Sequence, residues 1–319
     1  MGPGVEIIGA RITVRLHEPG GGFRDVVGTL ETLTSVRKTD GSLAHFSHDQ
    51  IAIWREIKPV PDRAGHGAPL SIRIQEIEIA ANATWPAKEE LRIGGWLLRA
   101  SGPFTMRANS VLPLGEVPYG NPGMELEKAI NTVVRFYRER KIVPVFHIPL
   151  PSYEELDREL SERGWEEKVL ANVMVADISE KYPEISDEII WETSDTPSNE
   201  WLEVQHDEPI AQIMGSYPAI YVGGRINGRL IAVGRASNFE KWTTLSRLFV
   251  SEDFRGRGIG RTCMERLLNN AREKGASKAL LQVDSKNAHA ITLYENLGFR
   301  FHHSYRYRAL SHSEKNQPC

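Results

Sequence analysis

Apolar residues recur with the period of a helix in the middle of the chain. Between positions 124 and 140 they follow the spacing i, i+3, i+4, i+7, i+8 and i+11, at Leu126, Ala129, Ile130, Val133, Val134 and Tyr137. A period of 3.6 residues places all of them on one face, so the pattern predicts an amphipathic helix. Around it we expect helices over 72–82 and 153–163 and strands over 92–99, 107–114 and 142–148.

The last third of the chain alternates short apolar runs with helical segments. Asn227-Gly228 separates two of these runs and is a strong signal for a β-hairpin. The pattern predicts a mixed, twisted sheet flanked by helices, which is an α/β fold. Strands are expected over 188–192, 219–225, 229–236, 243–250, 279–283 and 301–310, and helices over 201–214, 258–274 and 288–297.

The first sixty residues show no helical period and carry Gly-rich and Asp-Gly turns. They predict a small SH3-like β-barrel over residues 1–60, followed by an exposed Pro- and Gly-containing linker over 61–70. Basic and acidic side chains balance in this segment, which favours a docking or packing module over an RNA-binding surface. The five expected strands span 10–16, 26–33, 35–38, 43–46 and 51–57.

Composition narrows the class of protein further. The 319 residues are enough for two or three domains, and 39 basic against 42 acidic side chains give a net charge of −3, which argues against binding to a nucleic-acid backbone. No run of about 18 apolar residues and no basic, apolar leader is present, so we expect a cytoplasmic protein without a membrane partner. The two cysteines, Cys263 and Cys319, suggest neither a disulfide framework nor a metal site, and no metal is expected.

One loop between a predicted strand and a predicted helix suits a pyrophosphate. In Arg255-Gly-Arg-Gly-Ile-Gly260, followed by Arg261, small residues allow a tight turn and leave backbone N–H groups uncovered. The helix N-terminus adds a partial positive charge and the arginines add full charges. A P-loop is excluded because no Gly-Lys-[Ser/Thr] follows, and the Gly-x-Gly-x-x-Gly pattern of a Rossmann fold is absent.

This loop matches the R/Q-x-x-G-x-G/A signature of the GCN5-related N-acetyltransferases (GNAT). The segment from Asn287 to Phe299, Asn-Ala-His-Ala-Ile-Thr-Leu-Tyr-Glu-Asn-Leu-Gly-Phe, is similar to a second motif of that family. The resemblance covers about residues 185 to 310. It implies an acetyl-CoA-dependent N-acetyltransferase in which the pantetheine arm lies between two splayed strands.

The resemblance also implies roles for individual residues. The backbone of Leu248, Phe249 and Val250 should pair with the pantetheine amides, and a bulge there would expose an N–H group to the thioester carbonyl. The Asn287 side chain should bind the pantetheine arm, and Tyr294 has the position of the general acid that protonates the CoA thiolate, unless it only packs. The pyrophosphate should be held by Arg255, Gly256, Arg257, Gly258, Ile259, Gly260 and Arg261.

No general base is evident from the sequence, and a water relay is an alternative. The candidates are His206, Asp207, Glu208 and Glu240, each of which also fits a solvated charge. On the last strand, alternation puts His303, Tyr305 and Tyr307 on one face, where they line the acceptor pocket or form an ordinary half-buried strand. Cys263 lies on the apolar side of its helix and is interpreted as core filler rather than a nucleophile.

Residues 71–180 resemble a degenerate copy of the GNAT unit at residues 185 to 310. Gly123 and Gly164 are 41 positions apart and Gly258 and Gly298 are 40 apart. In the alignment, Leu160 stands where Tyr294 does and Tyr153 where Asn287 does, and Pro118 and Pro122 lack N–H donors in the loop. We therefore expect a tandem GNAT protein with a degenerate domain over 71–180 and a catalytic domain over 181–319, unless two α/β units simply look alike. The order of an N-terminal barrel, a degenerate copy and an active copy resembles that of an actinobacterial group of tandem GNAT proteins.

The sequence thus predicts an acetyl-CoA:amine N-acetyltransferase in which a neutral amine attacks the thioester directly in a ternary complex. A small-molecule amine is the expected acceptor. The alternatives are a protein lysine or N-terminal acetyltransferase and a non-catalytic acyl-CoA-binding sensor or scaffold. The acceptor's identity, the oligomeric state and the length of the acyl chain are left open.

Overall fold

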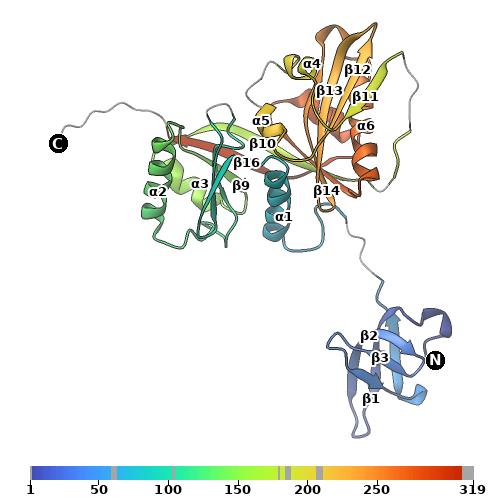
Figure 1. The fold of residues 1–319 in the computed structure, drawn as a ribbon. Helices are drawn as coiled ribbons and strands as arrows, with labels where there is room; N and C mark the ends of the chain where they lie inside the picture. The colour runs from blue at the N-terminus through green and yellow to red at the C-terminus, as the bar shows by residue number, and fades with distance from the viewer. Residues whose placement is uncertain are drawn as a thin grey trace. The chain divides into compact units, whose positions relative to one another are not determined.

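The computed structural model describes residues 2–58, 63–102, 105–178, 180–183, 188–205 and 211–310. Contacts divide the chain into two compact units, Met1–Asp62 and Arg63–Cys319 (Figure 1). No helix in the described ranges is long and apolar enough to cross a membrane.

The N-terminal unit is a five-stranded antiparallel sheet in the order β4-β3-β2-β1-β5. Alternate residues of β1 and β2 point inward, so that one face of the sheet supplies the core of this unit. The predicted strands are present, but the described residues form an open sheet, and a closed SH3-like barrel stays a prediction. The elements are η1 (Val5–Ile7), β1 (Arg11–His17), β2 (Phe23–Thr32), β3 (Ser35–Arg37), β4 (Leu43–His45), η2 (His48–Gln50) and β5 (Ile51–Glu56).

The second unit is built on one sheet of eleven strands in the order β11-β12-β13-β14-β15-β10-β16-β9-β8-β7-β6. Its helices are α1 (Leu70–Ala83), α2 (Leu126–Glu139), α3 (Glu154–Glu162), α4 (Asn199–Glu203), α5 (Ala211–Met214), η4 (Glu252–Phe254), α6 (Ile259–Glu273) and α7 (Ala288–Glu295). Its strands are β6 (Glu89–Ile93), β7 (Trp96–Ala100), β8 (Val111–Pro113), β9 (Val145–Leu150), β10 (Trp165–Asp177), β11 (Ile190–Ser194), β12 (Ile220–Ile226), β13 (Arg229–Phe239), β14 (Trp242–Val250), β15 (Lys278–Asp284) and β16 (Arg300–Leu310).

Two strands join the halves of this sheet, because each of them pairs with a strand of the other half. The strand β10, which follows the first helical half, pairs with β15 of the second half, and β16 at the end of the chain pairs with β9 of the first half. They also pair with each other through most of their length. The halves therefore share one continuous sheet, and the division into domains at residues 180 and 181 stays a prediction.

Several predicted elements differ from the structure. The single strand expected over 92–99 is a hairpin, β6 and β7, because Gly94 adopts φ +54° at the turn. The strand expected over 107–114 is reduced to the three residues of β8. The helix expected over 201–214 is described as the two short helices α4 and α5, and residues 206–210 lie outside the described residues. The thirteen-residue strand β10 was not predicted at all.

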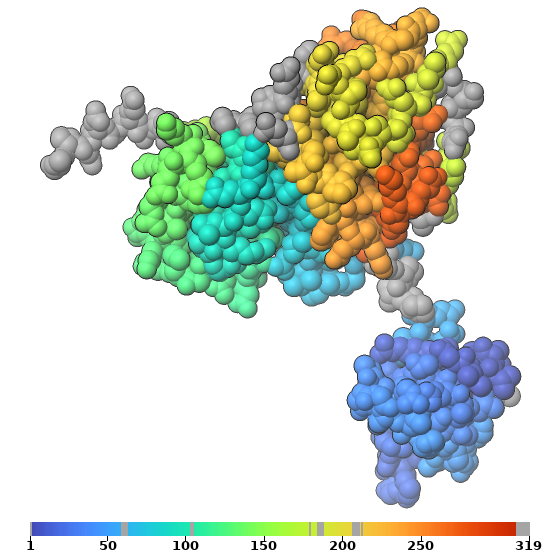
Figure 2. Space-filling model, viewed as in Figure 1, coloured from blue at the N-terminus to red at the C-terminus, as the bar shows by residue number. Residues whose placement is uncertain are grey.

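Helices cover both faces of the sheet around β14 and β15. On β15, Leu281 packs in the core under α6 and α7, whereas the neighbouring Leu280 packs in the core under α1. The helix α1 reaches the second half through a hydrogen bond of 2.8 Å between Thr84 Oγ1 and Thr244 Oγ1. It belongs by sequence to the first half but contacts β14 of the second. The space-filling view shows its light-blue surface between the teal part of the first half and the orange part of the second (Figure 2).

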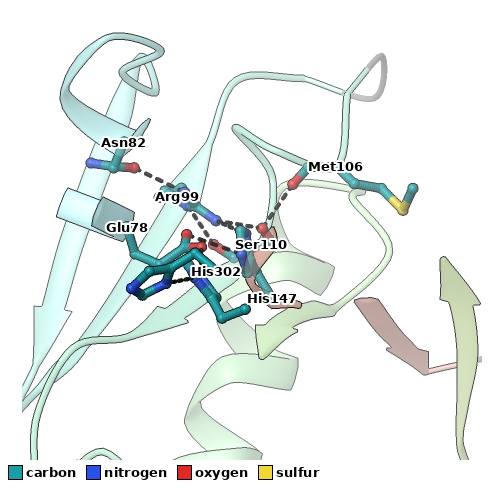
Figure 3. Close-up of polar contacts among 8 residues, drawn as sticks. Glu78, Asn82, Arg99, Met106, Ser110, His147 and His302 are labelled. Carbon is teal, nitrogen blue, oxygen red and sulfur yellow. Dashed lines mark hydrogen bonds and ion pairs between the residues drawn. The ribbon is translucent and has the colours of Figure 1, made fainter. Parts of the chain in front are cut away.

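A buried polar cluster fixes α1 to the sheet. Glu78 of α1 lies 3.1 Å from Nε2 of His147 on β9 and 2.9 Å from Nε2 of His303 on β16. Burial alone would raise the pKa of Glu78, but its contacts with the two imidazoles outweigh it and hold that pKa well below the usual range. Arg99 closes the cluster with hydrogen bonds to Asn82 and Ser110 (Figure 3).

Candidate active site

The site forms where two parallel strands part. The strands β14 and β15 pair from Trp242 with Lys278 to Leu245 with Leu281, and no pair follows Leu245. Parallel strands that separate in this way leave both backbones and the side chains between them accessible to a ligand.

A β-bulge lies on β14 at the same level. The register with β13 passes from Phe249 opposite Val233 to Ser246 opposite Arg235, so β14 has one residue more than β13 in this stretch. Arg247 in the bulge adopts φ +61°, in the left-handed region. A bulge turns backbone groups out of the ladder, which is the feature that an oxyanion donor at this place requires.

A pocket of about 310 Å³ occupies the gap between the parted strands. It contains two residues of the second motif, Asn287 and Tyr294, together with Leu248 of β14. Phe249 and Val250 lie outside its lining and pack in other clusters. The lining residues are Gln205, Leu245, Ser246, Arg247, Leu248, Met264, Leu281, Gln282, Val283, Asp284, Asn287, Ala290 and Tyr294.

The glycine-rich loop forms the N-terminus of α6. Gly258 is the N-cap residue at φ +78°, and Gly256 adopts φ +74°, conformations that other residues rarely accept. No side chain caps this helix, so the first-turn N–H groups, including those of Ile259, Gly260 and Arg261, lack a side-chain acceptor at the N-cap. The loop therefore has the backbone geometry of an anion site.

The three arginines of the loop already have protein partners. Arg255 Nε donates to the Val250 carbonyl at 3.0 Å, and Arg257 Nη2 donates to the Asp253 carbonyl at 3.0 Å. Arg261 pairs with the buried Glu265 at 2.8 Å. Their positive charge still surrounds the helix N-terminus, but each guanidinium also braces the loop.

Asn287 is the N-cap residue of the helix α7, and Tyr294 lies in its last turn. The Asn287 side-chain oxygen accepts a hydrogen bond of 3.1 Å from the Ala290 N–H and so caps the helix. The Tyr294 ring lies in the pocket lining with its centroid 6.2 Å from that of Phe299. Burial raises the pKa of Tyr294 to about 12. At neutral pH the phenol is therefore protonated.

The other candidates fall into four groups. Cys263 is fully buried between α6 and the sheet, and burial raises its pKa to about 12, in keeping with core filler. Glu240 is exposed in the turn between β13 and β14. Three candidate bases, His206, Asp207 and Glu208, lie outside the described residues, as does Cys319. The last group, His303, Tyr305 and Tyr307, is buried on the α1 side of β16.

Polar residues on the α1 side of the gap were not predicted from the sequence. Ser246 and Gln282 line the pocket, and their buried side-chain atoms have no hydrogen-bond partner in the described part of the chain. Polar atoms in this state mark a place where a ligand or water completes the bonding. The signal in the sequence was a lone polar residue inside the apolar run Leu280-Leu-Gln-Val283. No group of three His, Cys, Asp or Glu residues that fits a metal ion occurs among the residues described.

A pocket between parted parallel strands, beside a glycine-rich helix N-terminus, defines an acyltransferase of the GNAT class. Comparison with known proteins agrees. The family model described as "Probable histone acetyltransferase Rv0428c C-terminal" matches residues 71–308. The chain belongs to this family of GNAT N-acetyltransferases, and it is an acetyltransferase.

Two relatives span most of the chain. It is 28% identical over 320 residues to the "Probable histone acetyltransferase Rv0428c" of Mycobacterium tuberculosis, covering 94% of each chain. It is 30% identical over 253 residues to the "Uncharacterized N-acetyltransferase YobR" of Bacillus subtilis, covering 74% of this chain and 98% of that one.

Two solved structures share the fold. A GCN5-related N-acetyltransferase from Kribbella flavida has a TM-score of 0.61 at 16% identity and covers 74% of this chain and 95% of its own. A tandem GNAT protein from the clavulanic acid biosynthesis pathway has a TM-score of 0.52 at 11% identity and covers 76% of this chain and 89% of its own.

Proposed function

We propose that the protein transfers the acetyl group of acetyl-CoA to a primary amine by direct attack in a ternary complex. The observation that carries this proposal is the pocket between β14 and β15, which brings Leu248, Asn287 and Tyr294 together beside the bulge. Holding both reactants in one gap replaces a bimolecular encounter by an oriented one.

The chain's own groups fit an acyl-CoA in this gap. The uncapped N-terminus of α6, with Gly256 and Gly258 at positive φ, suits the pyrophosphate. The backbone of 248–250 pairs with the pantetheine amides, and the Asn287 amide nitrogen donates to the arm, because its oxygen caps α7. An N–H group turned out by the bulge stabilises the oxyanion that develops on the thioester carbonyl.

Tyr294 stabilises the departing thiolate. At a pKa of about 12 its phenol stays protonated and donates a hydrogen bond to the sulfur. Complete proton transfer to a thiolate with a pKa of about 8.5 is uphill, so the hydrogen bond itself is the contribution we assign to Tyr294. A water chain carries away the proton of the attacking ammonium.

The first half has a structural role and contributes no catalytic residue. We assign residues 71–180 as a degenerate GNAT copy whose helix α1 packs against β14, and residues 1–60 as an SH3-like docking module. A small-molecule amine suits a pocket of about 310 Å³.

A second candidate acceptor is a protein amine. It is favoured by the names of relatives, one called a probable histone acetyltransferase and another a ribosomal-protein bS18-alanine N-acetyltransferase from Escherichia coli that is 34% identical over 73 residues. A non-catalytic acyl-CoA sensor is the remaining alternative and would bind acetyl-CoA without acceptor-dependent turnover.

Release of CoA thiol from acetyl-CoA tests the proposal. The full chain is assayed with amino acids, amino sugars, small amines and short lysine peptides, and binding of acetyl-CoA is measured separately by calorimetry. Acceptor-dependent release with one class establishes the transfer and its acceptor. Binding without release supports the sensor, and the absence of binding contradicts the assignment of the pocket.

A further inference from the structure

Two arginines lie against one tryptophan on the α1 side of the sheet. The guanidinium carbons of Arg107 and Arg235 are 5.2 and 5.3 Å from the ring centroid of Trp85. Arg235 is on β13 and is fully buried, and Arg107 is half-buried in the segment before β8. We call Arg107 and Arg235 the arginine pair.

Arg235 has no anionic partner in the part of the chain that the structure describes. Its Nε donates to the Tyr221 hydroxyl at 3.4 Å and its Nη2 to the Thr84 carbonyl at 3.2 Å, while the buried Nη1 has no partner among the described residues. Arg107 stacks on Trp85, and it makes no hydrogen bond or ion pair with another described residue. Among the described residues no carboxylate pairs with either guanidinium group, an arrangement that costs free energy unless an anion joins it.

Arg99 and Arg308, the other arginines that are buried as whole residues among those described, differ from Arg235. Arg308 pairs with Asp157 through bonds of 2.6 and 3.0 Å. All three guanidinium nitrogens of Arg99 have acceptors on Asn82 and Ser110. Both of these arginines use all three guanidinium nitrogens, whereas Nη1 of Arg235 has no partner among the described residues, and a polar atom in this state is a candidate contact for a ligand or water.

The arginine pair lies beside the reacting gap. Arg235 is directly opposite Ser246 across β13 and β14, so their side chains share the α1 face, and Ser246 lines the pocket. Gln282, with its unpartnered amide, lines the pocket from β15. Arg235 is therefore the cross-strand neighbour of a residue that lines the pocket.

We propose that the arginine pair binds an oxyanion of the acceptor, so that the substrate is an amine that also carries a carboxylate or a phosphate group. The proposal rests on the proposed function and adds the acceptor's chemistry to it. A guanidinium presents planar donors that match both oxyanions. The same uncompensated positive charge repels a basic, lysine-rich segment, so the proposal disfavours histone-like acceptors.

Matched acceptors test the charge requirement. Each amino acid is compared with its C-terminal amide, and glucosamine 6-phosphate with glucosamine, so that the two arms distinguish carboxylate from phosphate. We expect kcat/KM to be at least about tenfold higher for the anionic member of the preferred pair. Equal or better use of the neutral members, or of basic lysine peptides, overturns the proposal.

Removal of one guanidinium tests the site. Arg107→Gln is the first variant, because Arg107 is half-buried and its loss leaves no hydrogen bond broken within the described residues. We expect it to lower kcat/KM for the anionic acceptor about tenfold and to leave the neutral acceptor and the KM for acetyl-CoA unchanged. The control Arg92→Gln removes the same charge from the exposed strand β6 and should change nothing.

A binding measurement covers the case in which no acceptor of the panel is used. The unfolding temperature of the chain with saturating acetyl-CoA is measured with acetate or inorganic phosphate and with chloride at equal ionic strength. A rise in the wild type that Arg107→Gln abolishes supports the site, and an equal response in both contradicts it. Failure of acetyl-CoA to bind at all counts against the proposed function instead.

Discussion

Two helices of the protein, α2 and α6, follow glycine turns, and only one of them begins at a surface that suits an anion. At α6 the N-cap Gly258 is flanked by arginines. Before α2, the Asn121 carbonyl accepts a hydrogen bond of 2.7 Å from the Gly95 N–H, and a Cβ atom on Gly94 would come within 2.5 Å of the loop backbone. The turn of the β6–β7 hairpin therefore packs against the backbone of the loop before α2, and the hollow beside that loop is lined by residues of 116–126 without an arginine.

The same contrast holds deeper in each half. Where the second half has Asn287 and Tyr294 beside a pocket, the first half has Tyr153 and Leu160 inside a packed core. The Tyr153 hydroxyl is used in a hydrogen bond of 2.7 Å to the Gly115 carbonyl. One arrangement of helices and strands thus serves either as a site or as a wall, and the difference lies in whether backbone donors and the gap stay open.

The largest difference between the two helices should appear when a negative charge is placed at each turn and the KM for acetyl-CoA is compared. In Gly258→Asp the carboxylate faces the pyrophosphate position, and like charges in contact cost several kcal/mol, so the KM for acetyl-CoA should rise at least about thirtyfold. Aspartate tolerates the left-handed conformation better than most residues, which favours folding of the variant. The matched Gly123→Asp should leave that KM unchanged, and an equal rise in both variants would end the distinction.

Removal of a hydroxyl should affect catalysis in one half and stability in the other. Tyr294→Phe should lower kcat about ten- to a hundredfold with little change in unfolding temperature, because Tyr294 lines the pocket and we assign its hydroxyl to the departing thiolate. Tyr153→Phe should lower the free energy of unfolding by about 1 kcal/mol, through its lost hydrogen bond, and keep kcat. Steady-state kinetics and urea unfolding measure both, and unchanged turnover in Tyr294→Phe would remove its assigned role.

The junction between the halves should be sensitive to acid. Burial chiefly lowers the pKa of His302 to about 4, so between about pH 6.5 and 4 the unfolded chain binds a proton that the folded chain does not. The pKa of Glu78 is also lowered, and its contribution, present above about pH 4.5, is lost as the pH falls further.

Both effects have the same sign, so the unfolding temperature should fall as the pH decreases from 7 to 4. His302→Gln should reduce the part of this fall above pH 4.5. The control His45→Gln changes an exposed residue of the N-terminal unit and should not. An unfolding temperature that stays constant or rises in the wild type over this range would contradict the prediction.

The sequence predicted the elements with strong local signals and missed those set by long-range contacts. The helix at 126–139 and the loop before α6 follow from apolar spacing and from glycine. The strand β10 was missed because its pairing with β15 and β16, over a hundred positions away, decides its conformation. The arginine pair was missed for the same reason, since Arg107 and Arg235 are far apart in the sequence and meet only at Trp85.

The binding stoichiometry of acetyl-CoA tests the central claim most directly. Calorimetric titration of the full chain should give one site per chain, lost in Gly258→Asp and retained in Gly123→Asp. Two sites per chain, or one site that survives in Gly258→Asp, would contradict the account. The first half would then bind the substrate that we assign to the gap between β14 and β15.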